Sequence, residues 1–164
     1  MSASITYLLD KASSAQIADH LLRCDADFTP ALSSRVDINE YAKKIGNKAR
    51  RFEAWSGGSL VGLVAAYCND RETRLAYITS VSVQRQWAGN GIATRLIARC
   101  VAHAVASAMR QVNLEVARED SRAIKLYEKC GFTAGELNAQ FVQMSLVLKR
   151  GEENEQHARL QRRK

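Results

Sequence analysis

The sequence predicts an α/β (α+β) fold, in which a mixed, mostly antiparallel sheet of about seven strands is covered by helices on both faces. Three observations predict it. Three apolar runs with the composition of strands follow one another over residues 50–83, separated by short turns. Two helical stretches precede these runs. A strand, a helix and a second strand then follow over residues 81–117, an order that favours a parallel pair within the sheet.

Capping residues mark the two helices of the N-terminal part. Residues 5–10, ITYLLD, are typical of a short strand, and Ser13 or Ser14 then caps a helix with apolar residues on one side. The sole proline, Pro30, marks a loop, and Asp37 is the expected cap of a second helix that runs through residue 45.

The strands of the middle part are separated by turn residues. The runs RRFEAWS and SLVGLVAAYCND flank Gly57 and Gly58, a pair that is typical of a β-hairpin, and LAYITSVSV is the next strand. These three runs should form consecutive antiparallel strands.

The C-terminal part begins with an amphipathic helix. Apolar residues recur at intervals of three and four from Ile92 to Ala108, which predicts a long helix with a polar opposite face. QVNLEVA is then a strand, SRAIKLYEKC is a short helix that Gly131 closes, and FTAGELN with FVQMSLVLK forms a closing pair of strands.

Length and composition set the class of protein. A chain of 164 residues is expected to form a single domain over residues 1–150, followed by a polar, basic tail over 151–164 that is too polar to bury an apolar face. No apolar run is long enough to span a membrane and the N-terminus has no leader pattern, so a cytoplasmic protein with no membrane partner is expected. The four cysteines are widely scattered, which predicts reduced thiols and no metal site.

The net charge of +7 favours anionic partners but does not choose among them. Part of it lies in RLQRRK at the C-terminus, where no aromatic residue interleaves with the basic ones. Nucleic-acid binding through the tail is therefore only a third hypothesis.

The turn Gly89-Asn90-Gly91 joins a strand to a helix. Such a turn directs unpaired backbone N–H groups and the positive end of the helix dipole at one point, which binds phosphate. Glycine permits positive φ and a close approach of the anion. The alternative is a tight turn with no ligand. A dinucleotide site is not favoured, because a third glycine is missing.

Two linked motifs carry a resemblance to a known family. The segments VSVQRQWAGNGIATRLI and LEVAREDSRAIKLYEKCGF resemble the acetyl-CoA motif and the following helix motif of the GNAT family of N-acetyltransferases, and the second half is similar to ribosomal-protein alanine acetyltransferases. The matching residues are Val83, Gly89, Gly91, Ile92, Ala93 and Leu96 in the first motif, and Ala123, Leu126, Tyr127, Gly131 and Phe132 in the second. The order of strands and helices over residues 5–148 is also similar.

The resemblance implies a binding site for acetyl-CoA, with no metal. The pyrophosphate would lie on the amides of residues 89–94, and the pantetheine amides would pair with the backbone near Val81 and Val83. A backbone N–H near Val81 would stabilise the oxyanion. The implied residues are Val81, Ser82, Val83, Ala88, Gly89, Asn90, Gly91, Ile92, Ala93, Thr94 and Asp120.

Two of these positions depart from the family pattern. Ala88 stands where arginine or glutamine is usual, so a side-chain clamp on the pyrophosphate is missing. Asp120 stands where asparagine is frequent, which leaves a hydrogen bond toward the pantetheine arm open.

Two side chains are candidates for proton transfer. Glu115 lies in the middle of the QVNLEVA strand, and the carboxylate at the matching position is the general base of the alanine acetyltransferases. The alternative is a solvated or ion-paired carboxylate; Glu53 and Glu72 are weaker candidates. Tyr127 matches the tyrosine that protonates the CoA sulfur in the family, and its alternative is a packed aromatic ring.

The three histidines, His20, His103 and His157, have no matching role and are expected at the surface.

The predicted function is transfer of the acetyl group from acetyl-CoA to a primary amine by direct attack in a ternary complex. A small-molecule acceptor is favoured, and residues 24–41 should form its wall, where Asp25, Asp27 and Asp37 could attract a cationic amine. One alternative is a protein N-terminus or lysine as the acceptor. Another is a non-catalytic acyl-CoA-binding regulatory module. The chain is expected as a monomer or a homodimer.

Overall fold

The computed structural model describes residues 4–148. Its first part consists of β1 (Thr6–Leu9), α1 (Ser14–Cys24), α2 (Ile38–Lys48), β2 (Arg50–Ser56), β3 (Ser59–Tyr67) and β4 (Leu75–Val83). Its second part consists of α3 (Ile92–Ala106), β5 (Gln111–Ala117), α4 (Ser121–Lys129), β6 (Thr133–Leu137) and β7 (Phe141–Val147). Short 3₁₀ turns lie at η1 (Asp25–Asp27), η2 (Leu32–Ser34) and η3 (Arg85–Trp87). The order of strands and helices is the predicted one.

The seven strands form one sheet in the order β1-β2-β3-β4-β5-β7-β6. Every neighbouring pair is antiparallel except β4 and β5, which are parallel. The parallel pair follows from the crossover through α3, whereas the short connections from β2 to β3, from β3 to β4 and from β6 to β7 give antiparallel neighbours. The prediction of a mixed, mostly antiparallel sheet is confirmed.

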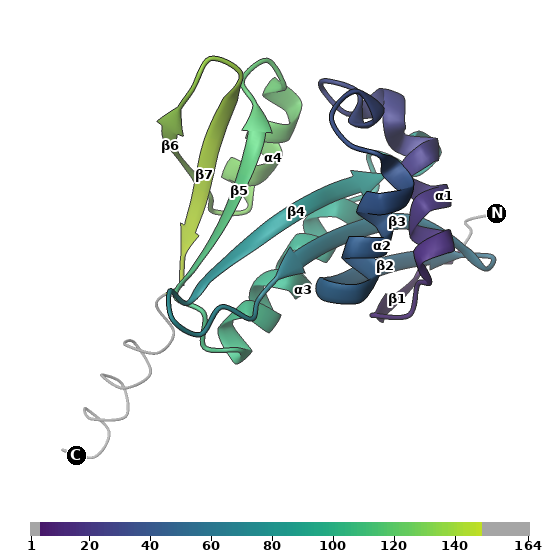
Figure 1. Cartoon of the computed structure of the whole chain (residues 1–164), viewed down its shortest axis with the longest axis horizontal. Helices are drawn as coiled ribbons and strands as arrows, with labels where there is room; N and C mark the ends of the chain where they lie inside the picture. The colour runs from purple at the N-terminus through teal and green to yellow at the C-terminus, as the bar shows by residue number, and fades with distance from the viewer. Residues whose placement is uncertain (1–3, 149–164) are drawn as a thin grey trace.

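The sheet splits between β4 and β5. Their ladder covers only Leu75–Tyr77 on β4 and residues 111–113 on β5, while β5 stays paired with β7 along its whole length. Figure 1 shows the two strands diverging from a common base, with α4 beside β5 and with α1 and α2 beyond β4. A β-bulge lies in β4 at the start of the split, because the register with β3 passes from Ile78 to Ser80 and leaves Thr79 without a partner. Beyond Tyr77, the β5 side of β4 therefore has no strand partner among the described residues.

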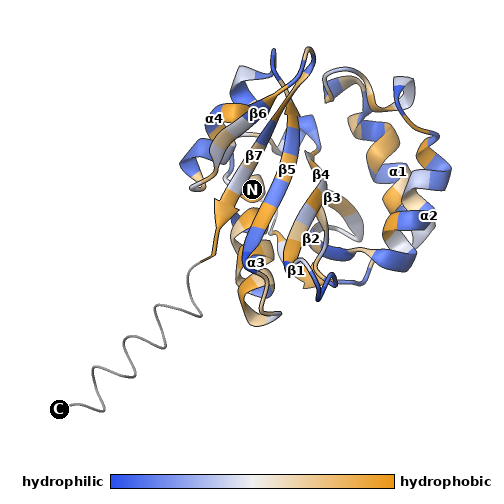
Figure 2. Ribbon diagram, turned by 60° about the vertical axis from the view of Figure 1, so that its left-hand side comes forward, coloured by the Kyte–Doolittle hydropathy of each residue, from blue (hydrophilic) through white to orange (hydrophobic). Residues whose placement is uncertain are grey.

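Two apolar cores cover the two faces of the sheet, as predicted. The first packs α3 and α4 on one face and includes Ile92, Leu96, Ile97, Cys100, Leu114 and Tyr127. The second packs α1 and α2 on the other face and includes Ile17, Leu21, Ala42, Ile45, Leu63 and Ala65. Because side chains alternate along a strand, β3 supplies residues to both cores. Figure 2 shows apolar and polar segments alternating along β5.

The local signals in the sequence are confirmed at the element ends. Ser13 caps α1 in a capping box with Gln16, and Asp37 caps α2. Gly57 and Gly58 turn the hairpin between β2 and β3.

All four cysteines are free: Cys24 and Cys100 are buried, and Cys68 and Cys130 are half-buried. Within residues 4–148, no helix is both long and apolar enough to cross a membrane. The tail over 151–164 lies outside the described residues.

Candidate active site

A cavity of about 730 Å³ lies between the end of β4, the start of α3 and α4. It is lined by every residue predicted to bind the cofactor except Asn90, namely Val81, Ser82, Val83, Ala88, Gly89, Gly91, Ile92, Ala93, Thr94 and Asp120. Segments that are far apart in the sequence, around positions 85 and 120, thus line one cavity. We call it the cofactor cavity.

The glycine turn gives this cavity a set of unpaired donors. Gly89 and Gly91 have φ values of 82° and 75°, a left-handed conformation that favours glycine. Gly91 is the N-cap of α3 and provides no side-chain cap, so the first-turn amides of the helix have no intrahelical acceptor. A Cβ at either glycine would meet nothing within 4 Å, so the backbone conformation rather than packing requires glycine here. This turn can hold an anion as the sequence predicts.

Side chains around the turn complete the cavity. Asn90 Nδ2 donates to the carbonyl oxygen of Trp87 at 2.9 Å, which explains why Asn90 faces the loop instead of the cavity. The lining also contains three basic side chains, those of Arg85, Arg122 and Lys129. Their charge complements an anionic ligand.

A second cavity, of about 300 Å³, opens between the loop over residues 27–36, α2 and the diverging strands β4 and β5. We call it the acceptor cavity. It shares six lining residues with the cofactor cavity, namely Asp27, Phe28, Val81, Asp120, Ala123 and Tyr127. The two cavities therefore meet at the split of the sheet, beside Tyr127.

Tyr127 is a buried residue of α4, with 8% of its surface exposed. Its ring contacts Phe132 edge-on, with the centroids 6.1 Å apart. Burial, and then the charge of Asp120, raise the pKa of the phenol above its ordinary value, so the hydroxyl stays protonated well into the alkaline range. Within residues 4–148 the hydroxyl has no hydrogen-bond partner, which leaves it free to donate to a ligand.

Glu115 is an exposed residue of β5 that lines the acceptor cavity and not the cofactor cavity. It pairs across the ladder with Gln143 of β7. The pKa of Tyr77, which lines the same cavity, is raised first by burial and then by the charge of Glu115. Glu115 and Tyr77 thus lie on the same cavity wall formed by the diverging strands.

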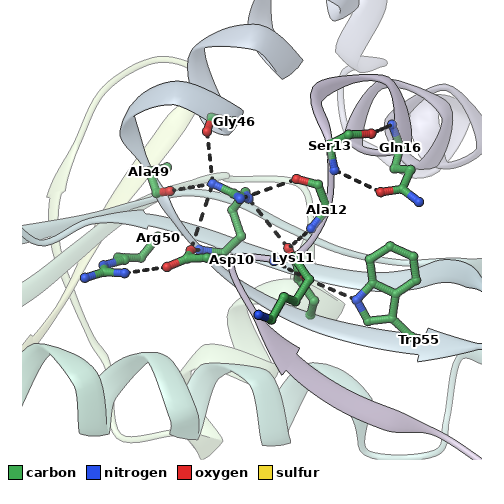
Figure 3. A network of polar contacts seen from close by, with 11 residues as sticks. Asp10, Lys11, Ala12, Ser13, Gln16, Gly46, Ala49, Arg50 and Trp55 are labelled. Carbon is green, nitrogen blue, oxygen red and sulfur yellow. Dashed lines mark hydrogen bonds and ion pairs between the residues drawn. The ribbon is translucent and has the colours of Figure 1, made fainter.

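The two weaker carboxylate candidates lie elsewhere. Glu53 on β2 is fully buried and accepts hydrogen bonds from the amides of Lys11 and Ala12 and from Trp55 Nε1, at 3.1, 3.0 and 3.0 Å. The buried guanidinium of Arg51 lies 3.5 Å from it. Figure 3 shows how this network ties the turn before α1 to β2. Neither Glu53 nor Glu72, in the turn after β3, lines either cavity.

The expected surface position of His20 is wrong. His20 is fully buried on α1, with Nδ1 3.0 Å from the Leu60 carbonyl oxygen and Nε2 2.8 Å from Ser82 Oγ. Burial lowers its pKa to about 4, so the ring is neutral at pH 7. Because a carbonyl oxygen only accepts, Nδ1 carries the proton and Nε2 accepts from the Ser82 hydroxyl.

His103 is half-buried rather than fully exposed and contacts Phe52 edge-on, with the centroids 5.6 Å apart. His157 lies outside the described residues.

Tyr41 of α2 lies in the segment 24–41 that was predicted to form the acceptor wall, and it lines the acceptor cavity, but its contact with β4 was not predicted. Its hydroxyl donates to the carbonyl oxygen of Thr79 at 2.6 Å and so holds the bulged residue of β4. The two residues are 38 positions apart, and no local pattern links them.

Asp120 has a defined structural role at the junction of the cavities. It caps α4, with Oδ1 accepting from the amide of Ala123 at 3.1 Å. An aspartate performs this capping as well as an asparagine does, which accounts for the residue type at this position.

Comparisons with known proteins identify the class of protein to which this fold and site belong. The model of the Acetyltransferase (GNAT) family matches residues 14–132. The chain is 32% identical over 82 residues to N-alpha-acetyltransferase MAK3 of Arabidopsis thaliana, an alignment that covers 49% of this chain and 43% of that protein.

Solved structures share the fold at low sequence identity. An acetyltransferase of Bacillus subtilis in complex with CoA has a TM-score of 0.68 at 15% identity, over 88% of this chain and 99% of the other. A chimera of the Vibrio cholerae spermidine N-acetyltransferase has a TM-score of 0.67 at 22% identity, over 87% and 95% of the two chains.

This protein belongs to the GNAT family of acetyltransferases. The family is one of acetyltransferases, enzymes that transfer an acetyl group.

Proposed function

We propose that the enzyme acetylates a small primary amine, with Glu115 as the general base and Tyr127 as the general acid. One observation carries the proposal: Tyr127 lines both cavities, whereas Glu115 lines only the acceptor cavity. An acid that protonates the CoA sulfur must lie where the two substrates meet, and a base for the amine must lie on the acceptor side.

Acetyl-CoA would lie in the cofactor cavity. Its pyrophosphate would accept hydrogen bonds from the amides of the turn and the first turn of α3, with positive charge from Arg122 and Lys129 nearby. Its pantetheine arm would pair with the unpartnered side of β4 around Val81 and Val83, where a backbone N–H would stabilise the oxyanion.

The transfer would then proceed in one ternary complex. The amine nitrogen attacks the thioester carbon, and its proton passes to Glu115. As the tetrahedral intermediate collapses, the C–S bond breaks and Tyr127 donates its proton to the departing thiolate. The products are the N-acetylated amine and CoA.

The size and closure of the acceptor cavity favour a small acceptor over a protein. A volume of about 300 Å³ accommodates a small molecule. The guanidinium carbon of Arg35, in the loop that lines the cavity, lies 4.9 Å from the ring centroid of Phe141 on β7, so a side chain bridges the two walls. A peptide would have to displace this contact.

A protein N-terminus is the second candidate acceptor. The partial similarity to an N-alpha-acetyltransferase favours it, although that alignment covers less than half of either chain. A non-catalytic acyl-CoA-binding module is a weaker candidate, because both proposed proton-transfer groups face the cavities.

A thiol-release assay with acetyl-CoA tests the proposed function. The purified protein would be offered a panel of small amines and a panel of peptides with free N-termini or lysines, with acetyl-CoA affinity measured separately by calorimetry. Turnover of small amines supports the proposal. Turnover of peptides alone, or acetyl-CoA binding with no turnover of any amine, contradicts it.

A further inference from the structure

Some of the charged side chains that line the acceptor cavity are already engaged with other groups of the protein, and others are not. Four charged residues line it, namely Asp27, Arg35, Glu115 and Asp120. Asp27 is ion-paired with Arg85, and Asp120 caps α4 through the amide of Ala123. Two acidic side chains of the cavity are thus already engaged.

Glu115 and Arg35 are the charges that remain for a ligand. Among the described residues, neither takes part in an ion pair. Arg35 is the single basic residue in the described lining of this cavity. The cavity therefore offers one free negative charge and one free positive charge.

Arg35 and Glu115 come from opposite walls. Arg35 directly follows η2 in the loop before α2, and its guanidinium lies over Phe141 of β7. Tyr77 of β4 lies within the influence of both charges: after burial, its pKa is raised by Glu115 and lowered by Arg35. Arg35, Tyr77 and Glu115 thus line one cavity of about 300 Å³, the size of a small ligand.

We propose that the natural acceptor carries an anionic group, a carboxylate or a phosphate, in addition to its amine, and that Arg35 binds this group while Glu115 receives the amine. The proposal rests on the proposed function and names the class of its substrate. A guanidinium presents a planar fork of donors that matches the oxygen atoms of either anion.

Other small amines fit these charges less well. A diamine would place its second ammonium group near Arg35, where like charges repel each other. An amine with no other charged group would give the guanidinium no anionic partner, so it would gain no charge-assisted hydrogen bond.

The test compares acceptors that share one scaffold. The first set contains three amino sugars: glucosamine has no anionic group, glucosamine 6-phosphate carries a phosphate, and 2-amino-2-deoxygluconate carries a carboxylate. Ethanolamine, O-phosphoethanolamine, β-alanine and 1,3-diaminopropane form a shorter set. The kcat/KM of each would be measured for the wild type, Arg35→Gln, Arg35→Lys and Arg71→Gln. Arg71 is the control, because it is an exposed arginine that lines neither cavity.

In at least one set, the wild-type kcat/KM for an anionic acceptor should exceed that for its uncharged counterpart by about tenfold or more. One charge-assisted hydrogen bond gives a difference of this size. Arg35→Gln should abolish this preference, Arg35→Lys should retain part of it, and Arg71→Gln should keep it. Preference for the phosphate or for the carboxylate identifies the anion.

Two results would overturn the proposal: a preference for neutral amines or diamines, or an anionic preference that Arg35→Gln leaves intact. If small amines react with the wrong preference, only the proposed substrate class fails. If no small amine reacts although acetyl-CoA binds, the proposed function fails as well.

Discussion

His20 of α1 accepts a hydrogen bond from Ser82 of β4, with Nε2 and Oγ 2.8 Å apart in the interior of the protein. The same ring donates from Nδ1 to the carbonyl oxygen of Leu60. A neutral imidazole thus joins α1 to two adjacent strands, one of which lines the cofactor cavity.

This contact predicts that the protein loses stability in weak acid. The pKa of His20 is about 4 in the folded protein and 6.5 for an unperturbed histidine. Between these values the unfolded chain binds the extra proton, so the free energy of unfolding should fall as the pH drops from about 6.5 to about 4. The loss is on the order of 3 kcal/mol. Urea unfolding at a series of pH values measures it.

Two variants control that experiment. His20→Asn retains a donor for the Leu60 carbonyl but cannot titrate, so its stability should vary less over the same range. His103→Asn should keep most of the wild-type slope, because His103 is only half-buried. An unchanged slope in His20→Asn would contradict the assignment.

The conformation of the glycine turn predicts a selective loss of cofactor binding. Valine at position 91 would be strained at a φ of 75°, so Gly91→Val should disturb the amides at the start of α3 and sharply weaken CoA binding. Gly58→Val is a matched control, since Gly58 has a φ of 79° in the hairpin after β2 and lines neither cavity. Calorimetry on the folded variants should show the loss in Gly91→Val only. Wild-type affinity in that variant would place the cofactor elsewhere.

The buried network around Glu53 predicts a large effect on stability. Glu53→Gln would remove the nearer of the two carboxylates beside the guanidinium of Arg51, leaving Asp10 at 3.9 Å, and would turn an amide group toward the backbone donors of Lys11 and Ala12. We expect a loss of about 3–5 kcal/mol in the free energy of unfolding. Glu40→Gln, which removes an exposed pair with Lys43, should cost at most about 1 kcal/mol. Denaturant titration compares the two, and similar losses would be inconsistent with a structural role for Glu53.

The sequence predicted the elements of the fold because local signals define them. Capping serines and aspartates, the Gly57-Gly58 turn and the periodicity after Ile92 each act within a few residues, and each appears in the structure. Most of the positions that line the cofactor cavity could be found because they lie in two short motifs, whereas Cys24, Asp27 and Phe28 lie outside both motifs.

Contacts between distant segments could not be predicted in the same way. The burial of His20 depends on Leu60 and Ser82, which lie 40 and 62 positions away, and nothing in its own helix signals a buried polar partner. The hydrogen bond from Tyr41 to Thr79 depends on a bulge that exists only once β3 and β4 pair. Arg35 meets Phe141 only because the fold brings the loop before α2 against the start of β7.

The position of Glu115 predicts a pH-dependent defect. Glu115→Gln should lower the rate most at pH values where the acceptor amine is protonated, because a base then contributes most, and a higher pH should partly restore it. Glu119→Gln is the control, since Glu119 is exposed and lines neither cavity. Profiles of kcat/KM against pH would be compared. A pH profile that Glu115→Gln leaves unaltered would show that Glu115 is not the general base.

Tyr127→Phe tests the central proposal most directly, because it removes one hydroxyl and keeps the buried ring. Tyr67→Phe is the control, because the Tyr67 hydroxyl is buried with no partner within residues 4–148 and Tyr67 lines neither cavity. On an acceptor that the wild type acetylates, we predict that Tyr127→Phe lowers kcat by about 10- to 1000-fold with acetyl-CoA affinity little changed, and that Tyr67→Phe stays near the wild-type rate. A wild-type kcat for Tyr127→Phe across pH 6 to 10 would contradict the assignment of Tyr127 as the general acid.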